Sequence, residues 1–254
     1  MEKEKKTTVG TFTQDPTKSI VKVQITRRIP DGVYIFTETV MFGHAFVLIS
    51  SNNQMTSYSY GRYGEQDTSQ GILFRYKGEL CKKYAMKELY RFNANVYKIL
   101  DVTPEKVSDT FEKIWLSSTQ PAKSKMPDSY NSGRVIDEYK LTSRNCTTVT
   151  INALQKSGTN IFKDNMLIER CKYVPSNFYD KSIYFLDDLD CINPEEDRFF
   201  IDPEDLEDYL EKISKENYCV INFSKKMRDV IPNTENYQYS PTKEIYRSFI
   251  GKSR

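Results

Sequence analysis

Residues 32–60 read GVYIFTETVMFGHAFVLISSNNQMTSYSY, and this stretch decides the fold. Its runs Gly32–Phe36, Phe42–Ile49 and Met55–Tyr60 have the length and the β-branched and aromatic content typical of strands. The four residues 51–54, Ser-Asn-Asn-Gln, are typical of a turn and separate the second run from the third. The pattern therefore predicts an antiparallel β region.

Helices are expected after this region. Thr103 is a good N-cap and Pro104 is favoured at the first helical position, so a helix is predicted over Pro104–Leu116. The other elements expected after residue 60 are helices at 80–92 and 203–214 and strands at 95–100 and 218–223. The expected fold class is α+β, an antiparallel β-sheet with packed helices.

Composition excludes several classes of function. Thirty-seven Lys and Arg residues against 35 Asp and Glu give a formal charge of +2, which provides no strong field to attract nucleic acid or an anionic membrane. The five cysteines form no CxxC pair and there is one histidine, so we expect no metal site and no cofactor. The N-terminus lacks the apolar run of a signal peptide, and no stretch approaches the ~20 apolar residues that span a bilayer. We expect a protein made in the cytoplasm, without a transmembrane segment.

The single histidine restricts the possible chemistry. Any mechanism that needs an imidazole must use His44, which opens the most apolar predicted strand. Gly43 precedes it and would let a backbone or a ligand approach closely. The alternative is a half-buried histidine whose hydrogen bonds are satisfied within the fold.

Cys146 is the candidate nucleophile. Gly158 is a helix C-terminal signal, and Ser143 or Asn145 could cap the other end, which places Cys146 in the first helical turn. There the unpaired amides and the positive end of the helix dipole favour a thiolate. The run Thr147–Ile151 is wholly β-branched and by propensity alone favours a strand, but good helix formers and a glycine follow it. The alternative is an ordinary buried thiol.

Three features together resemble the circularly permuted papain-like, NlpC-type cysteine peptidases and amidases. They are Gly43-His44-Ala45-Phe46 on a strand, the tyrosine-containing strand at 57–61, and the segment 139–148 with Asn-Cys-Thr-Thr at a helix start. In that family the histidine precedes the cysteine, as it does here. The resemblance covers roughly residues 20–160. It implies Cys146 as nucleophile and His44 as base.

The polar start of the chain and the span of the resemblance together suggest a division into three parts. We expect a flexible N-terminal segment at 1–18, a permuted papain-like catalytic core at 19–160, and a C-terminal extension at 161–254 packed on the core. A further strand is expected at 20–25.

The family usually adds a third polar residue on the strand after the histidine, and this residue orients the imidazole. Here that strand offers no Asp, Glu, His or Asn at the expected place. We select Ser57 as the third catalytic residue, with Ser59 or a backbone carbonyl as rivals. A weak third residue reduces rather than abolishes such chemistry.

The expected activity is hydrolysis of an amide or peptide bond, with the amides at the Cys146 helix start stabilising the oxyanion. The chain also resembles toxin domains that bacteria deliver into competitors, including type VI secretion amidase effectors. That likeness implies bacterial peptidoglycan as substrate, delivery into the periplasm of a target cell, and a cognate immunity protein as partner. Two alternatives stay open: a thioesterase, acyltransferase or lipid hydrolase that uses the same Cys-His site, and a non-catalytic binding module in which both residues belong to the core.

Overall fold

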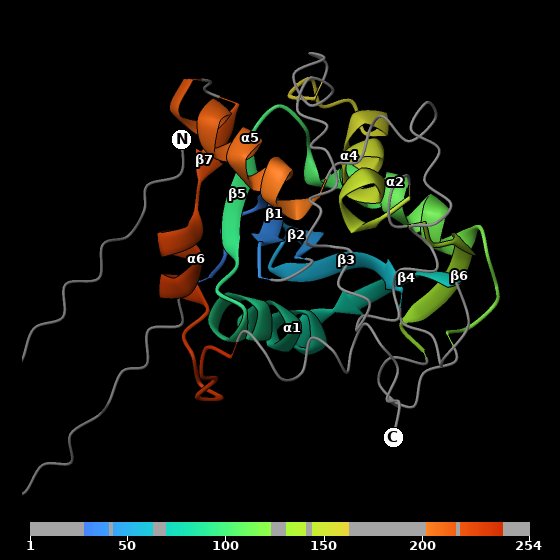
Figure 1. Cartoon of the computed structure of the whole chain (residues 1–254), viewed down its shortest axis with the longest axis horizontal. Helices are drawn as coiled ribbons and strands as arrows, with labels where there is room; N and C mark the ends of the chain where they lie inside the picture. Colours follow the sequence, from blue (N-terminus) through green and yellow to red (C-terminus); the bar gives the residue numbers. More distant parts are fainter. Residues whose placement is uncertain are drawn as a thin grey trace, which may run out of the picture.

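The computed structural model describes residues 28–40, 43–62, 70–122, 131–140, 144–162, 202–216 and 219–240. Within them the chain has an α+β fold, in which a seven-stranded antiparallel sheet lies between helices on both faces (Figure 1). The α+β class and the antiparallel sheet expected from the sequence are confirmed. The segments expected at 1–18 and 20–25 lie outside the described residues.

The order of strands across the sheet is β6-β4-β3-β2-β1-β5-β7. Every neighbouring pair is antiparallel. The strands are β1 Gly32–Glu38, β2 His44–Ser51, β3 Gln54–Arg62, β4 Gln70–Lys77, β5 Asn95–Ile99, β6 Gly133–Glu138 and β7 Val220–Asn222. The apolar stretch of the sequence thus forms the centre of the sheet, where β1 and β2 are buried on both faces.

A tight hairpin sets the register between β2 and β3. Asn52 and Asn53 both have positive φ values, 52° and 64°, and form the two-residue turn that matches the twist of the flanking strands. The ladder that follows pairs Ser51 with Gln54 and ends with Phe46 opposite Ser59. Because side chains alternate along a strand, this register also decides which residues of β2 and β3 share a face.

One face of the sheet, here called the α1 face, is covered by helices α1 (Gly78–Arg91) and α6 (Ser224–Val230) (Figure 1). Its core combines aromatic residues of β1 and β2 with apolar residues of the two helices. The main members are Tyr34, Phe36, Phe46, Leu48, Cys81, Ala85, Leu89 and Met227.

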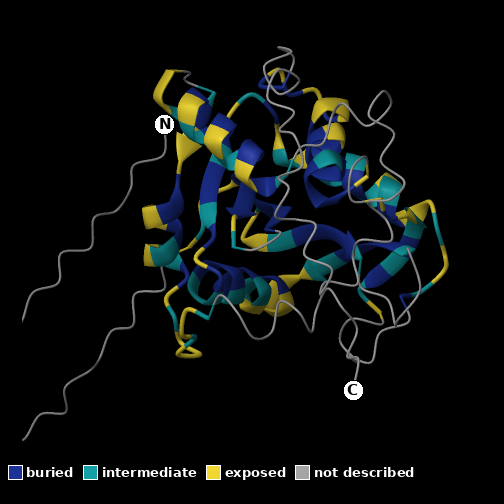
Figure 2. Cartoon of the chain, in the orientation of Figure 1, coloured by how far each residue is buried: buried dark blue, intermediate teal, exposed yellow. Residues whose placement is uncertain are grey.

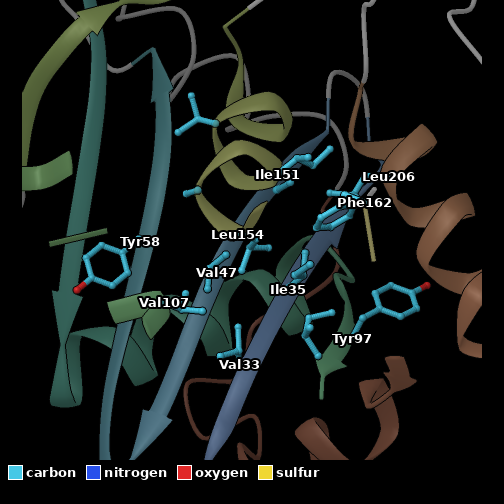
Figure 3. Packing of buried hydrophobic residues seen from close by; sticks show 14 of the residues in the cluster. Val33, Ile35, Val47, Tyr58, Tyr97, Val107, Ile151, Leu154, Phe162 and Leu206 are labelled. Carbon is cyan, nitrogen blue, oxygen red and sulfur yellow. The ribbon is translucent and has the colours of Figure 1, made fainter. Parts of the chain in front are cut away.

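The opposite face, here called the α4 face, is covered by helices α2 (Pro104–Leu116), α4 (Cys146–Lys156) and α5 (Pro203–Glu216). Figure 3 shows Ile151 and Leu154 of α4 near Val47 of β2 and Ile35 of β1. In Figure 2 the central strands are buried, and exposed residues lie on the outer sides of the helices. The fold is therefore three layers deep at β1 and β2.

Two helix starts agree with the sequence signals. The Thr103 hydroxyl accepts a hydrogen bond from the amide of Lys106, and the carboxylate of Asp202 accepts one from the amide of Asp205. The helices predicted at 104–116 and 203–214 are confirmed. The single tryptophan of the sequence, Trp115, lies on the buried side of α2.

The described part of the region after residue 160 belongs to the same sheet. Strand β7 pairs with β5, and α5 packs on the α4 face through Leu206, Tyr209 and Leu210. This region therefore extends the sheet as well as packing on it. Strands β4 and β6, which pair with each other, were not predicted from the sequence.

Candidate functional site

His44 is the first residue of β2, directly after the turn that leaves β1. Gly43 has a φ of +66°, and a Cβ there would lie 2.5 Å from the carbonyl oxygen of Glu38. Only glycine fits this left-handed, crowded position without strain. The turn pairs His44 across the strands with Glu38, and only 4% of the His44 surface is exposed.

The imidazole lies on the α1 face. Its Nε2 shares a hydrogen bond of 2.8 Å with the hydroxyl of Ser59, which in turn lies 2.9 Å from the hydroxyl of Tyr84 on α1. The ring also stacks on Phe46, two residues further along β2. Burial, and secondly the positive charge of Lys87, lower the pKa of His44 to about 4. The imidazole is therefore neutral at neutral pH, as a general base must be.

Ser57 does not occupy the place expected for it. It lies opposite Leu48, four residues along β2 from His44, and its hydroxyl contacts the thiol of Cys81. Four residues of strand span roughly 13 Å, which is too far for a hydrogen bond to the imidazole. The prediction of Ser57 as the orienting residue is corrected by the register, which brings Ser59 to His44 instead.

Cys146 is the first residue of α4, as predicted. Asn145 is the N-cap, and its side-chain oxygen accepts a hydrogen bond of 2.8 Å from the amide of Thr148. The hydroxyl of Thr148 accepts one of 2.9 Å from the amide of Asn145, which completes a capping box. Thr148, one of the β-branched residues that argue against a helix, is therefore part of the capping box that starts α4.

Cys146 is 5% exposed, and its thiol lies against the start of β2. Its sulfur accepts hydrogen bonds from the amides of Ala45 and Thr147. Burial nevertheless raises the pKa of the Cys146 thiol to about 11 against these hydrogen bonds. In this arrangement the thiol is protonated at neutral pH, so it needs a base to become a nucleophile.

The structure brings the two predicted segments together but turns their reactive groups to different faces. The sulfur of Cys146 contacts the amide of Ala45, the neighbour of His44 in β2. His44 and Phe46 point to the α1 face, whereas α4, which carries Cys146, packs on the α4 face. The direct imidazole–thiol pair expected from the sequence is therefore not the arrangement that the structure presents.

Two buried carboxyl groups, the strand partner of His44 and its electrostatic neighbour, were not selected from the sequence. Glu38 ends β1, and Glu88 lies on the buried side of α1. Burial raises the pKa of Glu38, and the charge of Glu88 raises it further; burial also raises the pKa of Glu88. The helical spacing of Glu88 from Cys81 and Ala85, both on the inner side of α1, is a signal that could have identified it.

The described residues contain no group of three or more His, Cys, Asp or Glu side chains placed to hold a metal ion. Nor does any helix within those ranges have the length and apolar character to cross a bilayer. Comparisons with protein-family models, curated proteins and solved structures gave no match.

Proposed function

We propose that the chain is a cysteine hydrolase with a permuted papain-like core, in which Cys146 attacks a carbonyl carbon and His44 is the base. One observation carries this proposal. The thiol at the capped start of α4 contacts the amide of Ala45, directly beside the only histidine of the chain. Thiol catalysis needs a thiolate at an activating position and a base within its reach, and the fold brings the segments that carry both to one end of β2.

The proposal includes a movement of the imidazole. The ladder between β2 and β3 ends at Phe46 and Ser59, so no β3 pair is formed at His44 or Ala45 within the described residues. At this end of β2 the sulfur of Cys146 already contacts the Ala45 amide. His44, as the first residue of the strand, turns there from Ser59 toward the thiol.

The chemistry then follows from the groups at this end of β2. The neutral imidazole takes the thiol proton, and the thiolate attacks the carbonyl carbon of the substrate. The amides of Ala45 and Thr147, which converge on the sulfur, donate to the oxyanion. The imidazolium gives its proton to the leaving amine as the thioester forms. Water, activated by the same imidazole, then releases the acyl group.

The proposed substrate is an amide or peptide bond in bacterial peptidoglycan. In this proposal the chain is an antibacterial effector delivered to the periplasm of a target cell, and a cognate immunity protein protects the producer. The support is the resemblance of Gly43-His44-Ala45-Phe46 and Asn145-Cys146-Thr147-Thr148 to that class. Transfer of an acyl group from a thioester or a lipid is the enzymatic rival, because it needs the same two residues.

Purified peptidoglycan provides the test. Wild type and the control Cys219→Ser should release soluble fragments, whereas Cys146→Ala and His44→Ala should release none. Equal release by all four proteins would remove the proposal. An acyl-thioester and a phospholipid, incubated in parallel and read by the intact mass of a Cys146 acyl adduct, separate the amidase from its enzymatic rival.

A non-catalytic binding module is the second candidate, and a specific observation favours it. Both reactive groups are at least 95% buried, the pKa of the thiol is raised to about 11 and the pKa of the imidazole is lowered to about 4. These values describe ordinary core residues if the imidazole never leaves Ser59. Thiol reactivity as a function of pH therefore separates the two candidates.

A further inference from the structure

Two arginines lie over the only tryptophan of the chain. The guanidinium carbon of Arg75 on β4 is 3.6 Å from the ring centre of Trp115, and that of Arg134 on β6 is 4.5 Å from it. The indole is buried, and its Nε1 donates a hydrogen bond of 3.0 Å to the carbonyl oxygen of Ser132. The two guanidinium carbons are therefore no more than about 8 Å apart, around a ring that is itself held in place.

The carboxylate in this cluster is Glu112 of α2, and it is occupied by other partners. Its Oε2 lies 2.5 Å from Nη1 of Arg75. Its Oε1 accepts a hydrogen bond of 2.8 Å from the hydroxyl of Tyr58 and lies 3.5 Å from Nζ of Lys77. One negative charge thus offsets only part of the positive charge of Arg75, Lys77 and Arg134.

Arg134 differs from Arg75 in having no acidic partner. Within the ranges that the structure describes, its guanidinium makes no hydrogen bond and no ion pair. The residue is half-buried, and its cross-strand partners are apolar, Leu73 of β4 on one side and Pro121 on the other. Five N–H donors in a planar fork are therefore held against an indole with no acceptor from these parts of the chain.

These features favour an oxyanion as a ligand. Carboxylate and phosphate groups match the guanidinium fork and can accept two parallel hydrogen bonds from it. A side chain that is already stacked on a ring loses less conformational entropy on binding than a freely moving one, so the arrangement is preorganised. The partly offset charge of Arg75 adds to the attraction of an anion.

We propose that Arg134, Arg75 and Trp115 form a binding site for one oxyanion, a carboxylate or a phosphate group. The fork of Arg134 donates hydrogen bonds to the oxygens of the ligand, the indole holds the fork, and Arg75 supplies a second positive charge. The site lies at β4 and β6, and β3 separates these strands from β2. It is therefore distinct from the candidate site at Cys146, and it does not depend on the proposed hydrolase.

The single tryptophan makes the test direct. The full chain is titrated with sodium phosphate and, separately, with sodium acetate, while sodium chloride keeps the ionic strength constant. Trp115 emission and the NMR signal of its indole N–H are followed together. We expect a saturable change with phosphate, with acetate or with both, and the anion that responds identifies the ligand group. No saturable change with either anion in either signal would overturn the inference.

Three variants separate the arginine fork from charge alone. Arg134→Gln should weaken binding roughly tenfold or more, because it removes charge-assisted hydrogen bonds. Arg134→Lys keeps the charge without the planar fork, should weaken binding by a smaller factor, and carries the test if Arg134→Gln does not fold. The control Lys113→Gln removes a charge from an exposed position of α2 and should bind as wild type does. Wild-type affinity in both Arg134 variants, or an equal loss in Lys113→Gln, would contradict the proposed site.

Discussion

The hydroxyl of Ser59 lies 2.8 Å from Nε2 of His44, and the hydroxyl of Tyr84 lies 2.9 Å beyond it. This chain of hydrogen bonds runs from β2 through β3 to α1 inside the protein. It holds the imidazole on the α1 face, away from the helix that carries Cys146. The resting position of the proposed base is therefore set by one hydroxyl on the neighbouring strand.

Removal of the Ser59 hydroxyl should destabilise the fold. We expect Ser59→Ala to lower the free energy of unfolding by about 1–3 kcal/mol, because it leaves a buried imidazole nitrogen and a tyrosine hydroxyl without their shared partner. Urea denaturation measures this change. Ser57→Ala is the matched control, since Ser57 is equally buried and contacts only the weakly bonding thiol of Cys81. Equal losses in the two variants would speak against the role given to Ser59.

The N-cap of α4 should make a measurable contribution to the free energy of unfolding. Asn145→Ala removes the oxygen that accepts from the Thr148 amide and should lower the free energy of unfolding by about 1 kcal/mol. Asn145→Asp, which keeps an acceptor at the same place, should recover most of it. Thermal or urea denaturation of the two variants measures both changes in the free energy of unfolding. A loss of the same size in both would show that the cap does not act through this oxygen.

Acid should destabilise the fold through His44. The folded-state pKa of about 4 is below the ordinary value of about 6.5, so the stabilising effect is present above pH 6.5 and is lost as pH falls toward 4. The loss should be on the order of 3 kcal/mol. It should be smaller in His44→Gln, which has no proton to gain. Urea denaturation at pH 7, 5.5 and 4.5 tests this, and parallel pH curves for the two proteins would refute it.

Glu38 should destabilise the fold as pH rises, whereas His44 destabilises it as pH falls. Its folded-state pKa is raised, so the stability given by the neutral carboxyl is present at low pH and is lost as pH rises above the ordinary value of about 4.3. Glu38→Gln should therefore gain stability relative to wild type between pH 4 and pH 8. Denaturation curves at both pH values supply the comparison. A difference between the proteins that does not change with pH would contradict the raised pKa.

Local signals in the sequence were sufficient for much of the fold. Thr103-Pro104 marked the start of α2, and the Asn52-Asn53 turn marked the central hairpin. Strand β6 was missed because it is short and is held mainly by its pairing with β4, some sixty residues earlier in the chain. Such a strand forms through a distant partner, and no local pattern has to reveal it.

The candidate site was predictable in part. The sequence placed Cys146 at a helix start and His44 at a strand start, and the structure has both. It could not give the direction of the imidazole. His44 alternates with Ala45 along a strand that is apolar on both faces, so its pattern does not say which set of side chains meets α4. The choice of Ser57 over Ser59 failed for a related reason, because it depended on a register fixed by the hairpin turn.

The central claim is that the imidazole of His44 can take the proton of Cys146. The rate of Cys146 alkylation by iodoacetamide, followed from pH 5 to pH 11 by peptide mass, tests it most directly. The account predicts a reactive phase with a midpoint in the neutral range in wild type, lost in His44→Ala and kept in Cys219→Ser. A single rise near pH 11 in all three proteins, the pKa of a thiol that stays buried without a base, would contradict it.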